Sequence, residues 1–143
     1  MALRLTTGCR TALAGTFGLK EIFNGGILEI YSGGQPAGAD YAETGTKLLT
    51  VMVAGTGGVT FGTAANGALP KSAETWNGTI GVSGVAGYFR LYGTAATSGT
   101  STTEKRIDGN VGVAGSDLVL SNTSLVAGAA LTIDSFTLTV PAS

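Results

Sequence analysis

Short apolar runs, each ended by glycine or other turn residues, follow one another through most of the chain. Ile27–Tyr31 reads ILEIY and is stopped by SGGQP, whereas Lys47–Ala54 reads KLLTVMVA and is almost continuously apolar, as in a strand covered on both sides. Runs of this length, between such turn signals, predict β-strands. Further strands are expected at Val59–Phe61, Trp76–Val82, Gly87–Tyr92, Lys105–Ile107, Asn110–Val113, Leu118–Ser121 and Ala130–Val140.

The last of these runs changes its apolar phase in the middle. Leu131 and Ile133 occupy odd positions, whereas Phe136, Leu138 and Val140 occupy even ones. Because side chains alternate between the two faces of a strand, the phase change indicates one of two structures. Either a β-bulge keeps all five side chains on one face, or the chain crosses from one sheet to another.

About eight short strands without an intervening helix predict an all-β fold. The expected architecture is a two-sheet sandwich of the jelly-roll kind, with a hairpin around Ser83-Gly84. Gly93–Glu104 is poor in apolar residues and is expected to be an exposed loop. We find no regular repeat and divide the chain into an N-terminal arm, residues 1–24, and a sandwich domain, residues 25–143.

The N-terminal arm has the only helical pattern. A short helix is predicted with Leu19, Ile22 and Phe23 on its apolar side, capped by Thr16 and ended by the sequence NGG. A weaker helix is expected over Thr6–Ala14, where glycines limit it. The arm either packs on its own domain or grips a neighbouring subunit, and the sequence leaves both possibilities open.

Composition narrows the classes of partner. The 143 residues include 24 glycines, against an ordinary share of about 7%, and only 12% are charged. The net charge is −1 with 43% hydrophobic residues, so the chain should fold and not stay disordered. Near-neutral surfaces tend to associate, which favours a place in an assembly. Nucleic-acid binding is not expected, because the eight basic residues are scattered: Arg4, Arg10, Lys20, Lys47, Lys71, Arg90, Lys105 and Arg106.

Neither a membrane nor an oxidising compartment is indicated. Arg4, Gly8 and Arg10 interrupt the first apolar residues, which argues against a signal peptide, and no apolar stretch is long enough for a transmembrane helix. Cys9 is the single cysteine, so an internal disulfide is excluded and a buried apolar role is expected. The expected place of the protein is a cytoplasm, or a particle assembled there.

The residue types give little support for catalysis. There is no histidine, so the commonest general base and metal ligand is absent, and Ser-His-Asp and Cys-His mechanisms and the usual four-ligand zinc sites are excluded. Gly55–Gly58 is not followed by the Lys-Ser/Thr of a phosphate-binding loop. Asp108-Gly109-Asn110 is read as a turn, not as a calcium loop. The carboxylates expected in or beside turns are Asp40, Glu43, Asp108, Asp117 and Asp134. We predict no enzyme, no cofactor and no metal.

Aromatic residues suggest a contact surface. Within Gly87–Tyr92, Phe89 and Leu91 alternate with Tyr88, Arg90 and Tyr92. If Phe89 faces the core together with Trp76, the other three form an exposed Tyr-Arg-Tyr stripe on the opposite face. Such a stripe would suit a protein contact, or the stacking of a carbohydrate. The residues predicted for an interface are Arg4, Arg10, Phe17, Tyr88, Arg90 and Tyr92.

Three parts of the chain, the first of them long, resemble a group of small structural proteins of tailed bacteriophages. They are Gly18–Gly33 (GLKEIFNGGILEIYSG) with the downstream residues QP, AD and AETGT, then Gly87–Tyr92 (GYFRLY), and the end of the chain from Arg106–Gly109 (RIDG) to Ile133–Pro141 (IDSFTLTVP). Similar proteins include jelly-roll cement proteins on the outside of capsids, often dimers or trimers.

The resemblance implies a phage capsid cement (decoration) protein that binds major capsid subunits and stabilises the mature head. It implies a location on the capsid exterior of the virion, with assembly in the host cytoplasm. The implied partners are the major capsid protein and further copies of this chain, as a homodimer or homotrimer, without nucleic acid or membrane. The alternatives are a tail, neck or head-fibre component, or a carbohydrate-binding module for host attachment.

Overall fold

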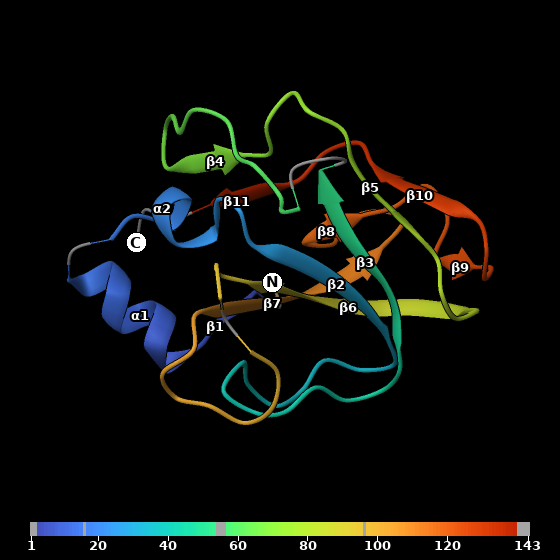
Figure 1. Ribbon diagram of the computed structural model, residues 1–143, viewed down its shortest axis with the longest axis horizontal. Helices are drawn as coiled ribbons and strands as arrows, with labels where there is room; N and C mark the ends of the chain where they lie inside the picture. The colour runs from blue at the N-terminus through green and yellow to red at the C-terminus, as the bar shows by residue number, and fades with distance from the viewer. Residues whose placement is uncertain (1–2, 16, 54–56, 96, 140–143) are drawn as a thin grey trace.

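The computed structural model describes residues 3–15, 17–53, 57–95 and 97–139 (Figure 1). The described chain is mostly β-strand, so the prediction of an all-β fold is confirmed. Its elements, in order, are β1 (Arg4–Leu5), α1 (Thr7–Ala14), α2 (Leu19–Phe23), β2 (Ile27–Ser32), β3 (Lys47–Val53), β4 (Ala68–Pro70), β5 (Trp76–Thr79), β6 (Gly84–Tyr92), β7 (Arg106–Gly112), β8 (Leu118–Val119), β9 (Ser124–Leu125), β10 (Ala130–Ile133) and β11 (Thr137–Thr139).

Two sheets pack against each other. The larger has the order β1-β7-β6-β2-β3-β5-β10, with β8 beside β7 and β9 beside β6, and the smaller pairs β11 with β4. In Figure 1 the small sheet and α2 lie over one side of the large sheet. Phe136 connects the layers, since its ring centroid lies 5.3 Å from that of Phe89 and 5.7 Å from that of Trp76. The two-sheet arrangement is thus present, whereas the jelly-roll topology remains a prediction.

The phase change in the last apolar run is a crossing between sheets. Residues up to Ile133 belong to β10 in the large sheet, and Thr137–Thr139 pair with β4 in the small one. Ile133, Phe136 and Leu138 are nevertheless buried in the same core. Of the two predicted explanations, the crossing is therefore correct for the described residues; Val140 lies outside them.

Three local predictions are wrong. No hairpin forms around Ser83-Gly84, because β2 and β3 lie between β5 and β6 in the sheet. Val59–Phe61 makes a single bridge, from Phe61 to Lys71, instead of a strand. The two short strands expected after residue 104 are one strand, β7, which pairs with β6 from Arg106 to Asn110.

Residues 3–15 and 17–24 are built into the fold. Arg4 and Leu5 form β1 on the edge of the large sheet, and Cys9 and Phe23 are fully buried in the core. Helix α1 starts where predicted, since the Thr6 hydroxyl oxygen accepts a hydrogen bond from the Cys9 amide at 3.1 Å. The predicted second helix is α2; its proposed cap, Thr16, lies outside the described residues. No helix among the described residues is long and apolar enough to cross a membrane.

Candidate functional site

The polar side chains of β2, β6 and β7 meet on the face of the large sheet opposite Phe89. The register pairs Tyr88 with Tyr31 and Arg90 with both Glu29 and Asp108, so the predicted alternation along β6 is correct. Two long connections, residues 33–46 and 93–105, cover this face. In Figure 1 they lie below β2 and β7. The polar cluster consists of the buried side chains beneath these connections together with Glu43, which belongs to the first of them: Tyr31, Glu43, Tyr88, Arg90, Tyr92 and Asp108.

Arg90 and Asp108 form a buried bidentate ion pair at the centre of the polar cluster. Arg90 Nε lies 2.5 Å from Asp108 Oδ1, Nη2 lies 2.8 Å from Oδ2, and neither residue is accessible to solvent. The remaining guanidinium nitrogen, Nη1, donates to the Tyr41 carbonyl at 2.9 Å and to Glu43 Oε1 at 3.0 Å. Every donor group of Arg90 therefore has a partner within the chain.

Glu43 ties both covering connections to the sheet. It belongs to the first connection, and its Oε1 accepts from Arg90 and, at 2.5 Å, from the Tyr92 hydroxyl. Its Oε2 accepts from the amide of Gly99, in the second connection, at 3.0 Å. Burial alone would raise the pKa of this carboxyl, but the hydrogen bonds from Tyr92 and Gly99 and the charge of Arg90 outweigh it and lower the pKa.

The tyrosines complete the packing of the polar cluster. Tyr31 and Tyr88 are stacked, with ring centroids 5.0 Å apart and an interplanar angle of 9°. The Tyr88 hydroxyl donates to the Thr44 carbonyl at 2.7 Å and accepts from the Thr44 amide at 2.9 Å. Tyr31 donates to Glu29 at 2.6 Å, and burial together with this hydrogen bond raises the pKa of the phenol, which therefore stays protonated.

Arg106, two residues before Asp108 on β7, attaches the second connection to the sheet. Its side chain is inaccessible to solvent and donates to the carbonyls of Gly99, at 2.5 Å, and Thr97. Its guanidinium carbon lies 5.8 Å from the centroid of the Tyr92 ring. On the other side, the Thr7 amide and hydroxyl donate to Asp40 at 2.7 and 2.6 Å, which joins α1 to the first connection. Both connections are thus held by charged groups.

The expected exposed Tyr-Arg-Tyr stripe is consequently wrong. Tyr88 and Arg90 are 0% exposed and Tyr92 is 5% exposed, because the two connections cover the face that the alternation assigns to solvent. Trp76 is 0% exposed as well and donates from Nε1 to the Thr60 carbonyl at 3.0 Å. The aromatic rings considered for stacking a carbohydrate are therefore enclosed in the protein.

The other three predicted interface residues are accessible. Arg4 and Arg10 are exposed; Arg4 donates to the Pro36 carbonyl and Arg10 donates to the Thr7 hydroxyl at 3.0 Å. Phe17 is 49% exposed and lies between the two helices, where it lines apolar hollows on either side. The structure thus divides the six predicted residues into three on the surface and three in the polar cluster.

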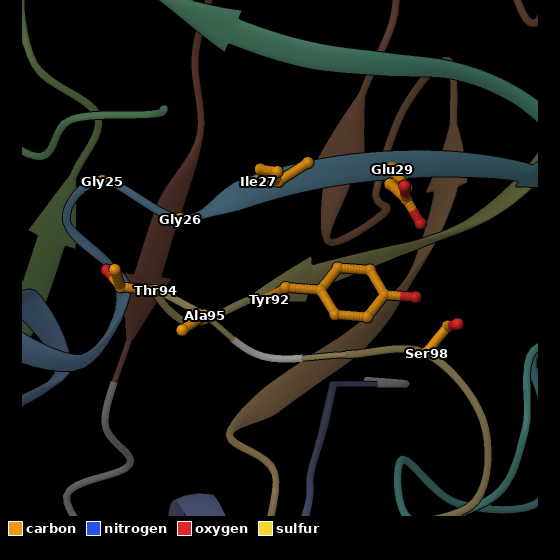
Figure 2. Close-up of a pocket in the computed structure, with 9 residues that line it drawn as sticks. Gly25, Gly26, Ile27, Glu29, Tyr92, Thr94, Ala95 and Ser98 are labelled. Atoms are coloured by element: carbon orange, nitrogen blue, oxygen red, sulfur yellow. The ribbon is translucent and has the colours of Figure 1, made fainter. Parts of the chain in front are cut away.

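A shallow cavity lies beside the polar cluster (Figure 2). It measures about 270 Å³ and is lined by Gly25, Gly26, Ile27, Glu29, Tyr92, Gly93, Thr94, Ala95 and Ser98. Figure 2 shows the Tyr92 hydroxyl pointing towards the end of the cavity where Glu29 and Ser98 lie. Two of the polar groups there already have partners: Tyr92 donates to Glu43, and Glu29 accepts from Tyr31 and, at 3.2 Å, from Lys47.

The structural role of two acids was missed by sequence reasoning. Asp108 and Asn110 lie within β7 and not in a turn, and Glu43 is anchored on β6 instead of standing free beside a turn. A usable signal is the Arg90 side chain on the polar side of a strand in a chain with few charges, because a buried arginine needs a nearby carboxylate. In the described ranges, no group of three or more potential ligands is placed to hold a metal ion.

Comparison with protein families, with curated proteins and with solved structures gives no significant match. The function is therefore inferred from the sequence and from the contacts described above.

Proposed function

We propose that this chain is a structural protein of a tailed-phage particle, and specifically a capsid cement protein. It would bind major capsid subunits on the outside of the mature head, associate with further copies of itself, and perform no chemistry. The resemblance of three parts of the chain, the first of them long, to phage structural proteins supports a place in a phage particle. One observation supports the adhesive role: the polar groups of the large sheet are used to lock two long connections, while apolar side chains remain on the surface.

The surface composition fits wide contacts between proteins. Three of the few charged side chains, Arg90, Arg106 and Asp108, are 0% exposed. Few charged groups on the remaining surface would therefore lose their water when a partner binds, so desolvation costs less than for an ordinary domain. Charged residues are depleted at the centres of protein interfaces because of this cost. The exposed large hydrophobic residues among those described are Phe17, Tyr41, Val82, Val85, Val113, Val119 and Val126.

The rigidity of the block also favours binding. Ordering flexible loops at an interface costs free energy, and connections that are already fixed by Glu43 and Arg106 do not incur that cost. A rigid block that contacts several capsid subunits at once gains avidity, because each later contact is effectively intramolecular. Binding to the mature shell alone then stabilises that shell by mass action.

The test uses particles of the phage that encodes this chain, assembled with its gene deleted. Purified protein is added to separated heads and tails, and bound protein is measured by co-sedimentation, followed by the temperature at which the heads release DNA. We expect saturable binding to heads and a higher release temperature. Binding to tails alone would support the tail or neck alternative, and binding to neither would overturn the proposal.

Phe17 offers a residue-level version of this test. Phe17→Ser removes an exposed apolar side chain beside α1, and we expect head binding to weaken about tenfold, as for a moderate interface residue. Val113→Ser is the matched control, because it removes an exposed apolar side chain at the end of β7, away from the helices. Equal effects of the two substitutions would contradict a contact centred on the N-terminal segment.

A further inference from the structure

The large sheet ends in an edge strand that lacks the usual protection. β10 is the last strand in the sheet order and, among the described residues, pairs only with β5. In an antiparallel edge strand, alternate backbone N–H and C=O groups point away from the partner and can pair with another strand. Natural proteins usually block such an edge with charge, proline or a bulge.

None of these devices occurs within β10, although a bulge-like pattern precedes it, where Ile80 donates to the Ala129 carbonyl and accepts from the amide of Gly128, whose φ is 91°. Between Asp117 and Asp134 the chain has no charged residue and no proline. The four pairs from Ala130–Thr79 to Ile133–Trp76 run in continuous register, so β10 has no bulge. The opposite end of the sheet differs, because β1 has two residues and one of them is the exposed Arg4.

The surroundings of β10 are exposed and apolar. Residues 126–130 and Thr132 are all exposed. Val126 is 64% exposed and Val85, next to it across the β6–β9 pair, is 60% exposed. Val82, 44% exposed, lies in the same region, since the neighbouring Ser83 hydroxyl accepts from the Ala127 amide at 2.9 Å. The free edge is therefore continued by apolar side chains.

We propose that β10 pairs antiparallel with β10 of a second copy of this chain, so that the two large sheets join across a twofold axis. Charge favours a second copy as the occupant. In a symmetric pair each strand faces the same sequence, so a charged strand would bring like charges opposite each other and destabilise the pair. β10 has no charged residue, so this repulsion does not arise. If Thr132 lies opposite Thr132 of the second copy, as a twofold axis at that residue requires, Asp134 lies opposite Ala130 and not opposite the other Asp134.

This inference makes the self-association in the proposed function specific: a dimer, formed through β10. Its test needs no capsid, so the two proposals can fail separately. A twofold strand pair is isologous and closes at two subunits, unlike a head-to-tail contact. The edge of β11 is also free of charge but has three residues and belongs to the two-stranded sheet, so it serves as the internal comparison.

Light scattering during size-exclusion chromatography should give twice the 14.2 kDa mass of the chain. Thr132→Lys places two like charges across the proposed pair and should raise the dissociation constant about tenfold or more. Thr137→Lys makes the same change at an exposed position of β11 and should leave the mass unchanged. Circular dichroism checks that both variants are folded.

Hydrogen exchange supplies a second readout that involves no substitution. The outward-facing amides of β10 should become more protected as protein concentration rises, because pairing with a second copy gives these N–H groups an acceptor. Amides of β11 should show no such change. A monomer at every concentration, a trimer, or a dimer that is sensitive to Thr137→Lys and not to Thr132→Lys would overturn the proposal.

Discussion

Replacing Asp108 by asparagine tests whether the polar cluster holds the fold together. The substitution keeps the size of the side chain but removes the charge that faces Arg90, which is inaccessible to solvent. The side-chain nitrogen of asparagine would face a guanidinium donor that now lies 2.8 Å from Oδ2. One of the two hydrogen bonds between Arg90 and residue 108 is then lost. The buried Arg90 guanidinium keeps only Glu43 as a charged partner.

The size of the effect follows from these contacts. Breaking a buried ion pair by removing one partner costs about 3–5 kcal/mol. Glu43 at 3.0 Å and the Tyr41 carbonyl at 2.9 Å still compensate Arg90, so we expect the lower end, about 3 kcal/mol. Asp134→Asn makes the same chemical change at an exposed position and should stay within about 0.5 kcal/mol of the wild type.

The assay is urea unfolding followed by circular dichroism. A lower midpoint at an unchanged slope reports a loss of stability. In Arg90→Met/Asp108→Leu both fully buried charges are replaced together. We expect this variant to lose no more stability than Asp108→Asn, because no uncompensated arginine remains and Glu43 keeps the hydrogen bonds from Tyr92 and Gly99. If Asp108→Asn costs less than about 1 kcal/mol, the cluster does not hold the fold as described. If the double variant is the less stable of the two, an uncompensated Arg90 is not the main source of the loss.

Three further predictions address other parts of the fold. In Gly8→Ala the new Cβ would lie 2.2 Å from the Thr103 carbonyl oxygen, so despite better helix propensity we expect a loss of about 1–2 kcal/mol in urea unfolding, whereas Gly34→Ala, with open space around it, should be nearly neutral. Because folding lowers the pKa of Glu43, the unfolded chain binds more protons in acid, and the free energy of unfolding should fall as pH drops from about 5 towards 2. The fall should be shallower in Glu43→Gln. A pH profile that is the same in this variant and in the wild type would contradict the prediction. Burial raises the pKa of the Cys9 thiol to about 11, so a thiol reagent at pH 8 should react only as fast as the protein opens, and rapid labelling of the native protein would show that Cys9 is accessible.

The local pattern predicted the elements that depend on neighbouring residues. The alternation in β6 and the two helices follow from period and turn signals within a few residues. The phase change in the last run left a bulge and a crossing between sheets as alternatives, and only the pairing of β10 and β11 decides between them. Pairings between distant segments could not be predicted in this way. β5 and β6 are neighbours in sequence, but β2 and β3 lie between them, and nothing in residues 76–92 specifies that order.

The covering of the polar face was missed for the same reason. Alternation assigns Arg90 to the side opposite Phe89, but whether that side meets solvent depends on residues 33–46 and 93–105. Arg90 and Glu43 are separated by 47 positions, and their pairing requires both connections to fold back. Gly8 was read as a residue that limits a helix, whereas its lack of a side chain allows α1 to approach Thr103.

The placement of charge connects the fold to the proposed function. Burying some of its few charged residues lowers the charge on the surface of the chain. A buried charge is tolerated only with a partner. Arg90, Asp108 and Glu43 meet that condition and at the same time fix the two connections that cover them. The same ion pairs therefore remove charge from the surface and make the block rigid, and both effects lower the free-energy cost of binding a neighbouring subunit.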